Sequence, residues 1–287
     1  MNNRRVHDAA AAVGCCLLLA ACSGSSSSGS GAGVTLPTAP GGSAATFEIA
    51  GDPESAGGAQ WTYRGTHGGV TYDLQGVLLK PRGPGPFPAV IISHGKGGSA
   101  NGYSRGIAAD FVSWGLVCIG TNYTHAGGVP LGAPGSAADE GASEANLLRA
   151  LRALDILASL GYVDAARVAA HGHSMGAFVT AALAGAHSNR LRVASHTAGG
   201  SLPGENPGTA APVEGQVRGI RVPYQLHHGD ADSVVPLTYD VRLAGVLRAQ
   251  GVSYELVVYP GAAHNDVARD AAMLARVRAW YAAHGMF

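Results

Sequence analysis

From residue 86 to the C-terminus the chain alternates between short apolar runs and longer segments with helical periodicity, which limits the folds open to it more than any other feature. Residues 89–92 read Ala-Val-Ile-Ile, a continuous apolar run typical of a strand buried on both faces. The segment 139–161 instead places its leucines and isoleucine along one broad stripe, as an amphipathic helix does. Strands that alternate with helices of ten or more residues imply right-handed crossovers and a parallel sheet covered on both sides. We therefore predict an α/β domain.

The other predicted elements extend this pattern along the chain. Residues 47–51, 60–65 and 68–81 favour antiparallel strands at the start of the sheet, because β-branched and aromatic residues stand between glycines. The Pro/Gly-rich stretch 200–220 favours a loop over a helical lid, and we find no internal repeat and no second domain. The further strands are expected at 86–95, 116–124, 166–172, 191–199, 222–229 and 253–261, and the helices at 104–115, 139–161, 174–188, 237–251 and 265–285.

The N-terminus has the layout of an export signal. Arg4 and Arg5 precede an uncharged apolar run from residue 9 to residue 21. This run is shorter than the ~20 residues that a membrane-spanning helix needs, which disfavours a transmembrane anchor. The run ends in Leu-Ala-Ala followed by Cys22, which resembles the lipobox of bacterial lipoproteins, whose cysteine carries the lipid and becomes the mature N-terminus. Ordinary secretion with cleavage nearby is the alternative.

We therefore expect three segments. Residues 1–21 form a lipoprotein signal peptide, residues 22–45 a Ser/Gly-rich tether that cannot bury a core, and residues 46–287 one large α/β domain. The expected location is the cell envelope, with the lipid on Cys22 as the contact with the membrane, or otherwise outside the cell.

Charge and cysteine usage narrow the classes further. Nineteen Lys and Arg balance nineteen Asp and Glu, which argues against a nucleic-acid partner. Of the four cysteines, Cys15 and Cys16 lie in the signal and Cys22 at the lipobox, while Cys118 stands alone in an apolar run and is expected to be a buried thiol. We predict neither a disulfide nor a metal site.

The sequence Gly172-His173-Ser174-Met175-Gly176 lies between a predicted strand and a predicted helix. This is the context of a G-x-S-x-G nucleophile elbow, in which a serine is exposed on a sharp turn and the glycines avoid collisions with neighbouring elements. The start of the following helix offers free backbone N–H groups to a developing oxyanion. The motif therefore predicts that Ser174 is a nucleophile.

A serine nucleophile needs a base and an orienting carboxylate. In chains with this type of nucleophile elbow the three residues follow along the sequence in the order serine, acid, histidine. Residues 227–236 follow a predicted strand and hold both Asp230 and Asp232. Residues 259–266 follow the last predicted strand and hold His264. We predict His264 as the base, with the acid open between the two aspartates.

The segments SHGKGG, GHSMG, HGDADSVVP and YPGAAH together resemble the α/β-hydrolase superfamily, and in particular the dienelactone hydrolase-like esterases and their serine relatives, over roughly residues 60 to 287. The resemblance implies an α/β-hydrolase fold without a large lid, and it favours Asp232 as the acid, with Asp230 as the alternative. It also implies an oxyanion hole from the backbone N–H groups of Met175 and Lys96, with Gly97 as second choice. Dienelactone hydrolase itself carries a cysteine nucleophile where this chain has Ser174, so the dienelactone substrate does not carry over.

The predicted activity is hydrolysis of carboxylic esters, small or polymer-derived, through an acyl-enzyme and without a cofactor. A peptidase or amidase on the same scaffold, and a non-catalytic binding lipoprotein, are the alternatives. His125 follows a predicted strand on the active-site side and is a candidate substrate-binding residue, as are Tyr103 and Tyr123, although surface loop positions would explain all three equally well. The side chain of Lys96 either faces solvent or binds an anionic group of the substrate.

Overall fold

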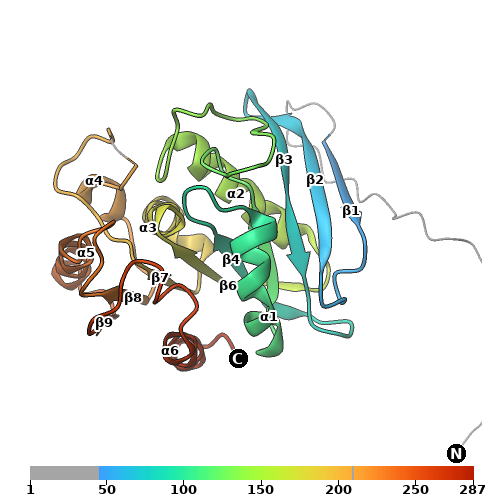
Figure 1. Cartoon of the computed structure of the whole chain (residues 1–287). Coiled ribbons are helices and arrows are strands. Elements are labelled where there is room, and N and C mark those ends of the chain that lie inside the picture. The colour runs from blue at the N-terminus through green and yellow to red at the C-terminus, as the bar shows by residue number, and fades with distance from the viewer. Residues whose placement is uncertain (1–44, 209) are drawn as a thin grey trace, which may run out of the picture. The chain divides into compact units, whose positions relative to one another are not determined.

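A nine-stranded mixed sheet runs through the part of the chain that the computed structural model describes, residues 45–208 and 210–287. The predicted signal peptide, Cys22 and, apart from Ala45, the predicted tether lie outside these residues. The strands follow one another across the sheet in the order β1-β2-β3-β5-β4-β6-β7-β8-β9 (Figure 1). They are β1 (Thr46–Ala50), β2 (Ala59–His67), β3 (Val70–Leu79), β4 (Phe87–Ser93), β5 (Val117–Thr121), β6 (Val163–His173), β7 (Val193–Thr197), β8 (Tyr224–Gly229) and β9 (Tyr254–Tyr259).

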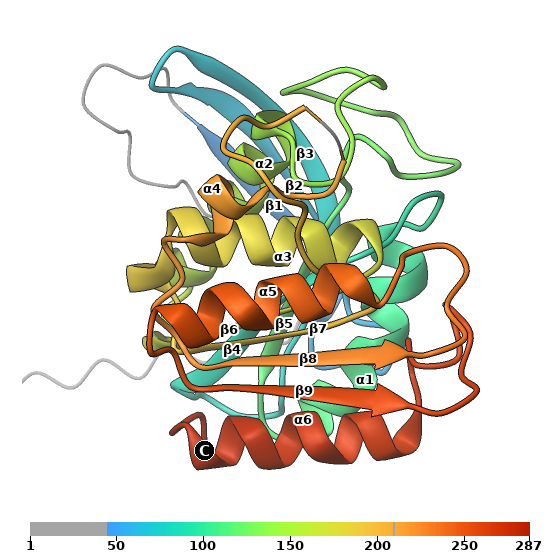
Figure 2. The same ribbon diagram turned by 90° about the vertical axis from the view of Figure 1, so that its left-hand side faces the viewer.

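The pairing divides the sheet into two parts. β1, β2, β3 and β5 pair antiparallel, as the glycine-bounded early segments predict. From β5 through β4, β6, β7 and β8 to β9 every pairing is parallel. The arrows of β8 and β9 in Figure 2 therefore end at the same edge, where the loops that follow them meet.

Helices cover both faces of the sheet. One face is covered by α2 (Glu144–Ser159), α3 (Met175–Ala186), the short α4 (Glu214–Val217) and α5 (Thr238–Ala249), whose buried side chains join one apolar cluster. The other face is covered by α1 (Arg105–Ser113) and α6 (Ala271–Ala283). Figure 2 shows α3 and α5 on one side of the sheet and α6 on the other. Two single turns, η1 (Ala100–Ser104) and η2 (Ser188–Arg190), complete the helical elements of the described residues.

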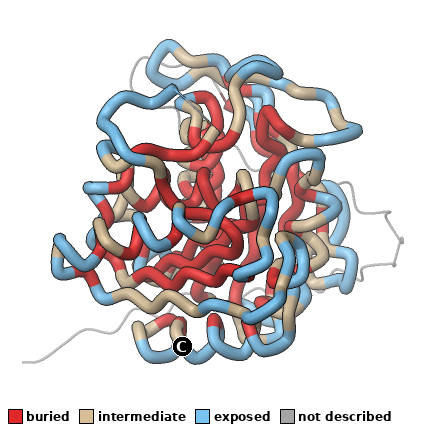
Figure 3. Tube along the Cα trace, turned by 60° about the vertical axis from the view of Figure 1, so that its left-hand side comes forward, coloured by how far each residue is buried: buried red, intermediate tan, exposed pale blue. Residues whose placement is uncertain are grey.

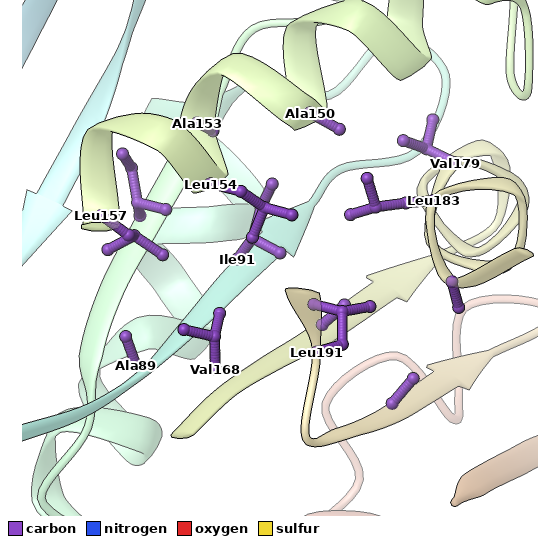
Figure 4. Packing of buried hydrophobic residues seen from close by; sticks show 14 of the residues in the cluster. Ala89, Ile91, Ala150, Ala153, Leu154, Leu157, Val168, Val179, Leu183 and Leu191 are labelled. Atoms are coloured by element: carbon purple, nitrogen blue, oxygen red, sulfur yellow. The ribbon is translucent and has the colours of Figure 1, made fainter. Parts of the chain in front are cut away.

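Strand β4 shows why a continuous apolar run was needed. Ala89 and Ile91 belong to the cluster beneath α2 and α3, whereas Val90 and Ile92 belong to the cluster beneath α1 and α6. All four side chains are fully buried, because successive residues of a strand point to opposite faces and both faces are covered. Burying one such aliphatic side chain stabilises the fold by roughly 2 kcal/mol. Figure 4 shows the packing around Ile91, with Leu154 and Leu157 close by.

The predicted boundaries differ from the structure mainly at the last helix. The expected helix 265–285 begins only at Ala271, because Asp270 acts as its N-cap and its carboxylate accepts a hydrogen bond from the N–H of Met273 at 2.9 Å. Residues 264–269 instead form turns at the edge of the sheet. A histidine at this point is thus held by a loop rather than by a helix.

The predicted α/β-hydrolase architecture is confirmed, with parallel strands at the centre and helices on both faces. Figure 3 shows the buried centre of the sheet and the exposed connecting loops around it. Cys118 is a free, buried thiol, as expected. None of the helices in residues 45–208 and 210–287 has the length and hydropathy of a membrane-spanning segment.

Candidate active site

Ser174 lies on the tight turn between β6 and α3. Its backbone has φ 57° and ψ −122°, a conformation that costs a non-glycine residue free energy and is retained where the surroundings enforce it. The two glycines of the motif make the turn possible. A Cβ on Gly172 would lie 2.2 Å from the carbonyl oxygen of Gly176, and a Cβ on Gly176 would lie 2.0 Å from the carbonyl oxygen of Ser93. The motif therefore has the packing that an elbow requires.

Three predicted site residues meet at this edge of the sheet. His264 Nε2 lies 2.9 Å from Ser174 Oγ, and His264 Nδ1 lies 2.7 Å from Asp232 Oδ2. Since a carboxylate only accepts, Nδ1 carries the proton and Nε2 is free to accept the hydroxyl proton of Ser174. The loops after β6, β8 and β9 bring these side chains together, because parallel strands end at one edge. The arrangement can deprotonate the serine as a bond forms to it.

The surroundings of Asp232 keep it ionised and oriented. Its side chain is 0% exposed, and Oδ1 accepts hydrogen bonds from the N–H groups of Val234 and Val235, both at 2.9 Å. Burial by itself would raise the pKa of Asp232, but the hydrogen bonds from His264 and from these two amides bring it below its ordinary value. Asp230 is exposed and accepts a hydrogen bond from the N–H of Gly261 at 2.6 Å. Of the two aspartates left open by the sequence, the structure places Asp232 against His264.

Two backbone segments that lie next to Ser174 carry the predicted oxyanion donors. Met175 is the first residue of α3, where the N–H groups have no partner within the helix. The loop after β4 approaches from the other side, since a Cβ on Gly95 would lie 3.1 Å from the Cβ of Ser174. The N–H of Gly97 donates to the carbonyl of His125 at 3.0 Å, whereas the N–H of Lys96 has no acceptor among the residues that the structure describes. This geometry favours Lys96 over Gly97 as the second donor to an oxyanion.

A cavity of about 330 Å³ adjoins Ser174. Its walls are mostly apolar, and part of them belongs to a small apolar cluster that includes Phe178 and Val235. Lys96 is one of the lining residues, and its ammonium group pairs with Glu140 at 2.6 Å. The sequence reasoning missed most of this lining, since loop and helix residues that share a cavity show no common pattern. The residues around the cavity are Lys96, Ser174, Met175, Phe178, Leu202, Ala210, Ala211, Val234, Val235 and Tyr239.

The predicted substrate-binding residues are not among those that line this cavity. Tyr123 is 0% exposed, and its hydroxyl lies 2.8 Å from Ser93 Oγ, so the expectation that it binds substrate is wrong. Tyr103 lies against the ring of His173 and within 3.4 Å of His171 Nε2. The hydroxyl of Tyr103 also lies 3.4 Å from the carbonyl oxygen of Ala268, so the contacts of this side chain are with β6 and the turns before α6.

His125 is also buried, but it contacts the loop that carries Lys96. Its Nε2 donates to the carbonyl of His94 at 3.1 Å, while its own carbonyl accepts from the N–H of Gly97 at 3.0 Å. Burial lowers the pKa of His125, so the ring is neutral at pH 7. The residue therefore holds the 94–97 loop from both ends instead of lining the pocket.

The histidines around the elbow are neutral packing residues. Burial lowers the pKa of His94 to about 3 and that of His173 to about 4. The ring of His173 lies 5.0 Å from that of His264, and its Nε2 lies 3.2 Å from the amide oxygen of Asn265. Within residues 45–208 and 210–287 no group of three or more His, Cys, Asp or Glu side chains is arranged to hold a metal ion.

Solved structures with the same fold include both esterases and peptidases. An acetyl xylan esterase from Paenibacillus sp. R4 superimposes with a TM-score of 0.61 at 18% identity, covering 84% of this chain and 88% of that one. An acetyl ester-xyloside bifunctional hydrolase from Caldicellulosiruptor lactoaceticus gives 0.58 at 18%, covering 76% and 89%. An acylaminoacyl peptidase from Pyrococcus horikoshii gives 0.60 at 15%, covering 83% of this chain and 47% of that one.

This chain spans less than half the length of the peptidase structures that it matches. No curated protein matches it. The model of the dienelactone hydrolase family matches residues 74–287, which include the elbow, both aspartates of the acid loop and His264. The chain therefore belongs to the dienelactone hydrolase family.

Proposed function

We propose that this protein is a serine esterase that hydrolyses carboxylic esters through an acyl-enzyme on Ser174. The hydrogen-bonded chain from Asp232 through His264 to Ser174, beside an apolar cavity, is the observation that carries the proposal. Each of the three side chains has the partner that its role requires.

In the first half of the reaction Ser174 Oγ attacks the ester carbonyl carbon. As the new C–O bond forms, the hydroxyl proton passes to His264 Nε2, and the charge on the imidazolium is balanced by Asp232. The carbonyl oxygen becomes an oxyanion, for which the N–H groups of Met175 and Lys96 are the candidate donors. Collapse of the tetrahedral intermediate breaks the bond to the alcohol, which leaves with the proton from His264.

In the second half a water molecule takes the place of the alcohol. His264 accepts its proton as the oxygen attacks the acyl carbon, and the bond to Ser174 Oγ then breaks. The serine recovers its proton from the imidazolium, and the carboxylic acid is released. All proton transfers use the same nitrogen, so the neutral form of His264 is required at the start of each half.

The cavity supports esters with an uncharged acyl group. Its walls include Phe178, Leu202 and Val235, which solvate hydrocarbon well and carboxylates poorly. The charge of Lys96 is paired with Glu140, which disfavours its use as a site for an anionic substrate group. The similar length of the two esterase structures, against the much longer peptidases, supports esters over peptides.

We also propose that the protein is anchored to the cell envelope through a lipid on Cys22. This proposal rests on the basic start, the apolar run and the lipobox-like end of residues 1–22. An anchored esterase on a Ser/Gly tether would meet its substrate outside the cytoplasm.

Two measurements test the esterase proposal. A fluorophosphonate probe should label the wild-type protein and not Ser174→Ala, because it reacts only with an activated serine. A panel of p-nitrophenyl esters of increasing acyl length, run beside matched p-nitroanilides, should give turnover of the esters only. Labelling that persists in Ser174→Ala, or faster cleavage of the anilides, would contradict the proposal.

A further inference from the structure

A second buried acid and two buried histidines lie directly behind Asp232. His228, at the end of β8, places Nδ1 2.8 Å from Asp240 Oδ2, and Asp240 comes from α5. The other carboxylate oxygen of Asp240 lies 2.7 Å from Nε2 of His196, on β7. The side chains of His228, Asp240 and His196 are all 0% exposed. The esterase mechanism above uses none of them.

The hydrogen-bond partners of His228 define its charge. Nδ1 faces the carboxylate of Asp240, and Nε2 faces the carbonyl oxygen of Val235 at 2.9 Å. Both partners can only accept when Asp240 is ionised, so both nitrogens of His228 must carry a proton. Nε2 also lies 3.4 Å from Asp232 Oδ2, the same oxygen that accepts from His264.

His196 differs because one of its partners can donate. Its Nδ1 lies 2.9 Å from the hydroxyl of Tyr224, so a neutral ring can donate from Nε2 to Asp240 and accept from the tyrosine. One proton on each side of Asp240 then satisfies the cluster. Two carboxylates face His228 directly, those of Asp232 and Asp240. His264 contacts the first carboxylate and His196 the second, and Tyr224 contacts His196.

The electrostatics agree with this assignment. Burial alone would raise the pKa of Asp240, but the hydrogen bonds from His196 and His228 and the charge of His228 bring it below its ordinary value. Burial likewise would lower the pKa of His228, but the hydrogen bond and charge of Asp240 and the charge of Asp232 bring it above its ordinary value. An imidazolium between two carboxylates is thus the stable form near neutral pH.

We propose that His228 is a positioning residue, a buried imidazolium held by Asp240 that fixes the Asp232 carboxylate from behind and weakens its attraction for the proton on His264. The inference rests on the proposed function, because it gives His228 a role only if His264 acts as a base. Without the cation, Asp232 and Asp240 would place two uncompensated negative charges behind His264, which would hold its proton to higher pH.

The expected size of the effect follows from the distances. The steps from His228 Nε2 to Asp232 Oδ2 and from there to His264 Nδ1 measure 3.4 and 2.7 Å. A unit charge at about 6 Å, with an effective dielectric constant of about 20, corresponds to a shift of roughly one to two pH units. His228→Gln should therefore move the acid limb of the plot of kcat/KM against pH to higher pH by about that amount. A role in folding alone would lower the amount of active enzyme without moving this limb.

His227→Gln is the matched control. His227 is the neighbouring residue, is equally buried and points to the other face of the sheet, with Nδ1 2.9 Å from the hydroxyl of Tyr259. Burial lowers the pKa of His227 to about 3, so this variant removes a neutral ring and should leave the acid limb in place. The double variant His228→Gln/Asp240→Asn removes one charge of each sign. Its acid limb should therefore lie at a pH between those of the wild type and of His228→Gln.

The deciding experiment combines the pH profiles with nitrogen NMR of the histidine rings. In the wild type, both nitrogens of His228 should be protonated at pH 7.5, and in His228→Gln the titration midpoint of His264 should rise together with the acid limb. A bare nitrogen on His228, or a limb and midpoint that stay at the wild-type pH in the variant, overturns the proposal. If the variant does not fold, the wild-type ring signals alone decide. A wild-type protein without esterase activity would refute the proposed function instead. The NMR titration would still show whether both ring nitrogens of His228 carry a proton.

Discussion

Asp232 Oδ2 lies 2.7 Å from His264 Nδ1, although the two residues are 32 positions apart and come from loops after different strands. The contact is possible because β8 and β9 are parallel neighbours, with Gly229 beside Tyr259 at their ends. The loops that leave these strands meet at one edge, and the Asp232 carboxylate is turned toward His264 by two backbone N–H groups.

The first prediction concerns this contact. Asp232→Asn should lower kcat by about 10³- to 10⁴-fold, because an amide no longer selects the His264 tautomer with a free Nε2 or stabilises its charged form. Asp230→Asn should change kcat by less than about tenfold, since the amide oxygen can still accept from Gly261. Steady-state kinetics of the two variants, both checked for folding, would test this. The reverse ranking would make Asp230 the acid.

The second prediction concerns the serine and its base. Ser174→Ala and His264→Ala should each remove nearly all esterase activity, and the double variant should be no worse than either single one. The groups act as a unit, so the losses are not additive. Equal residual rates in the three variants, without an initial burst of product, would support this prediction. Losses that multiply would mean that the two residues act separately.

The third prediction concerns His125 and the loop that carries Lys96. His125→Ala should lower kcat by about 10- to 100-fold with a smaller change in KM, because the loop loses its side-chain anchor and the N–H of Lys96 is no longer held toward the oxyanion. His67→Ala, an exposed hairpin position, is the control. A rise in KM with an unchanged kcat would instead assign His125 to substrate binding.

The fourth prediction concerns stability and pH. Burial lowers the pKa of His94 and of His227 to about 3, and of His173 to about 4, whereas an unfolded chain restores values near 6.5. Below about pH 6.5 the unfolded state therefore binds protons that the native state does not, and stability falls as the pH decreases toward these folded values. Each pKa unit is worth about 1.4 kcal/mol, so several kcal/mol should be lost between pH 7 and pH 5. Urea midpoints that are flat over this range would contradict the prediction.

The fifth prediction concerns the envelope anchor. Cys22→Ser should move the protein from the membrane fraction to a soluble fraction or leave an unprocessed precursor, since the Ser/Gly tether itself has no apolar anchor. Fractionation with mass spectrometry of the mature N-terminus would test this. A wild-type protein without lipid on Cys22 would exclude the anchor.

Local patterns in the sequence were sufficient to predict the architecture. The run Ala89 to Ile92, the stripe of α2 and the glycines around Ser174 each reflect a constraint that acts within a few residues, such as period, burial on both faces or the steric limits of a turn. The placement of Ser174, Asp232 and His264 in loops at one edge of the sheet could also be expected, because it depends only on which strands precede which loops. The late start of α6 at Ala271 was missed, since the capping side chain of Asp270 competes with a helical pattern that continues on both sides of it.

Tertiary structure alone decided the finer points of the site. The contact of His264 with Asp232 and not with Asp230, the burial of Tyr123 and the anchoring of the 94–97 loop by His125 depend on which way a side chain turns within a loop. The cluster of His228 with Asp240 brings together residues of β8 and α5 that no spacing rule connects. A strand or a helix repeats its side-chain directions at a fixed period, so its faces can be read from the chain. A loop has no such period, and its side chains take the directions that contacts with distant segments impose.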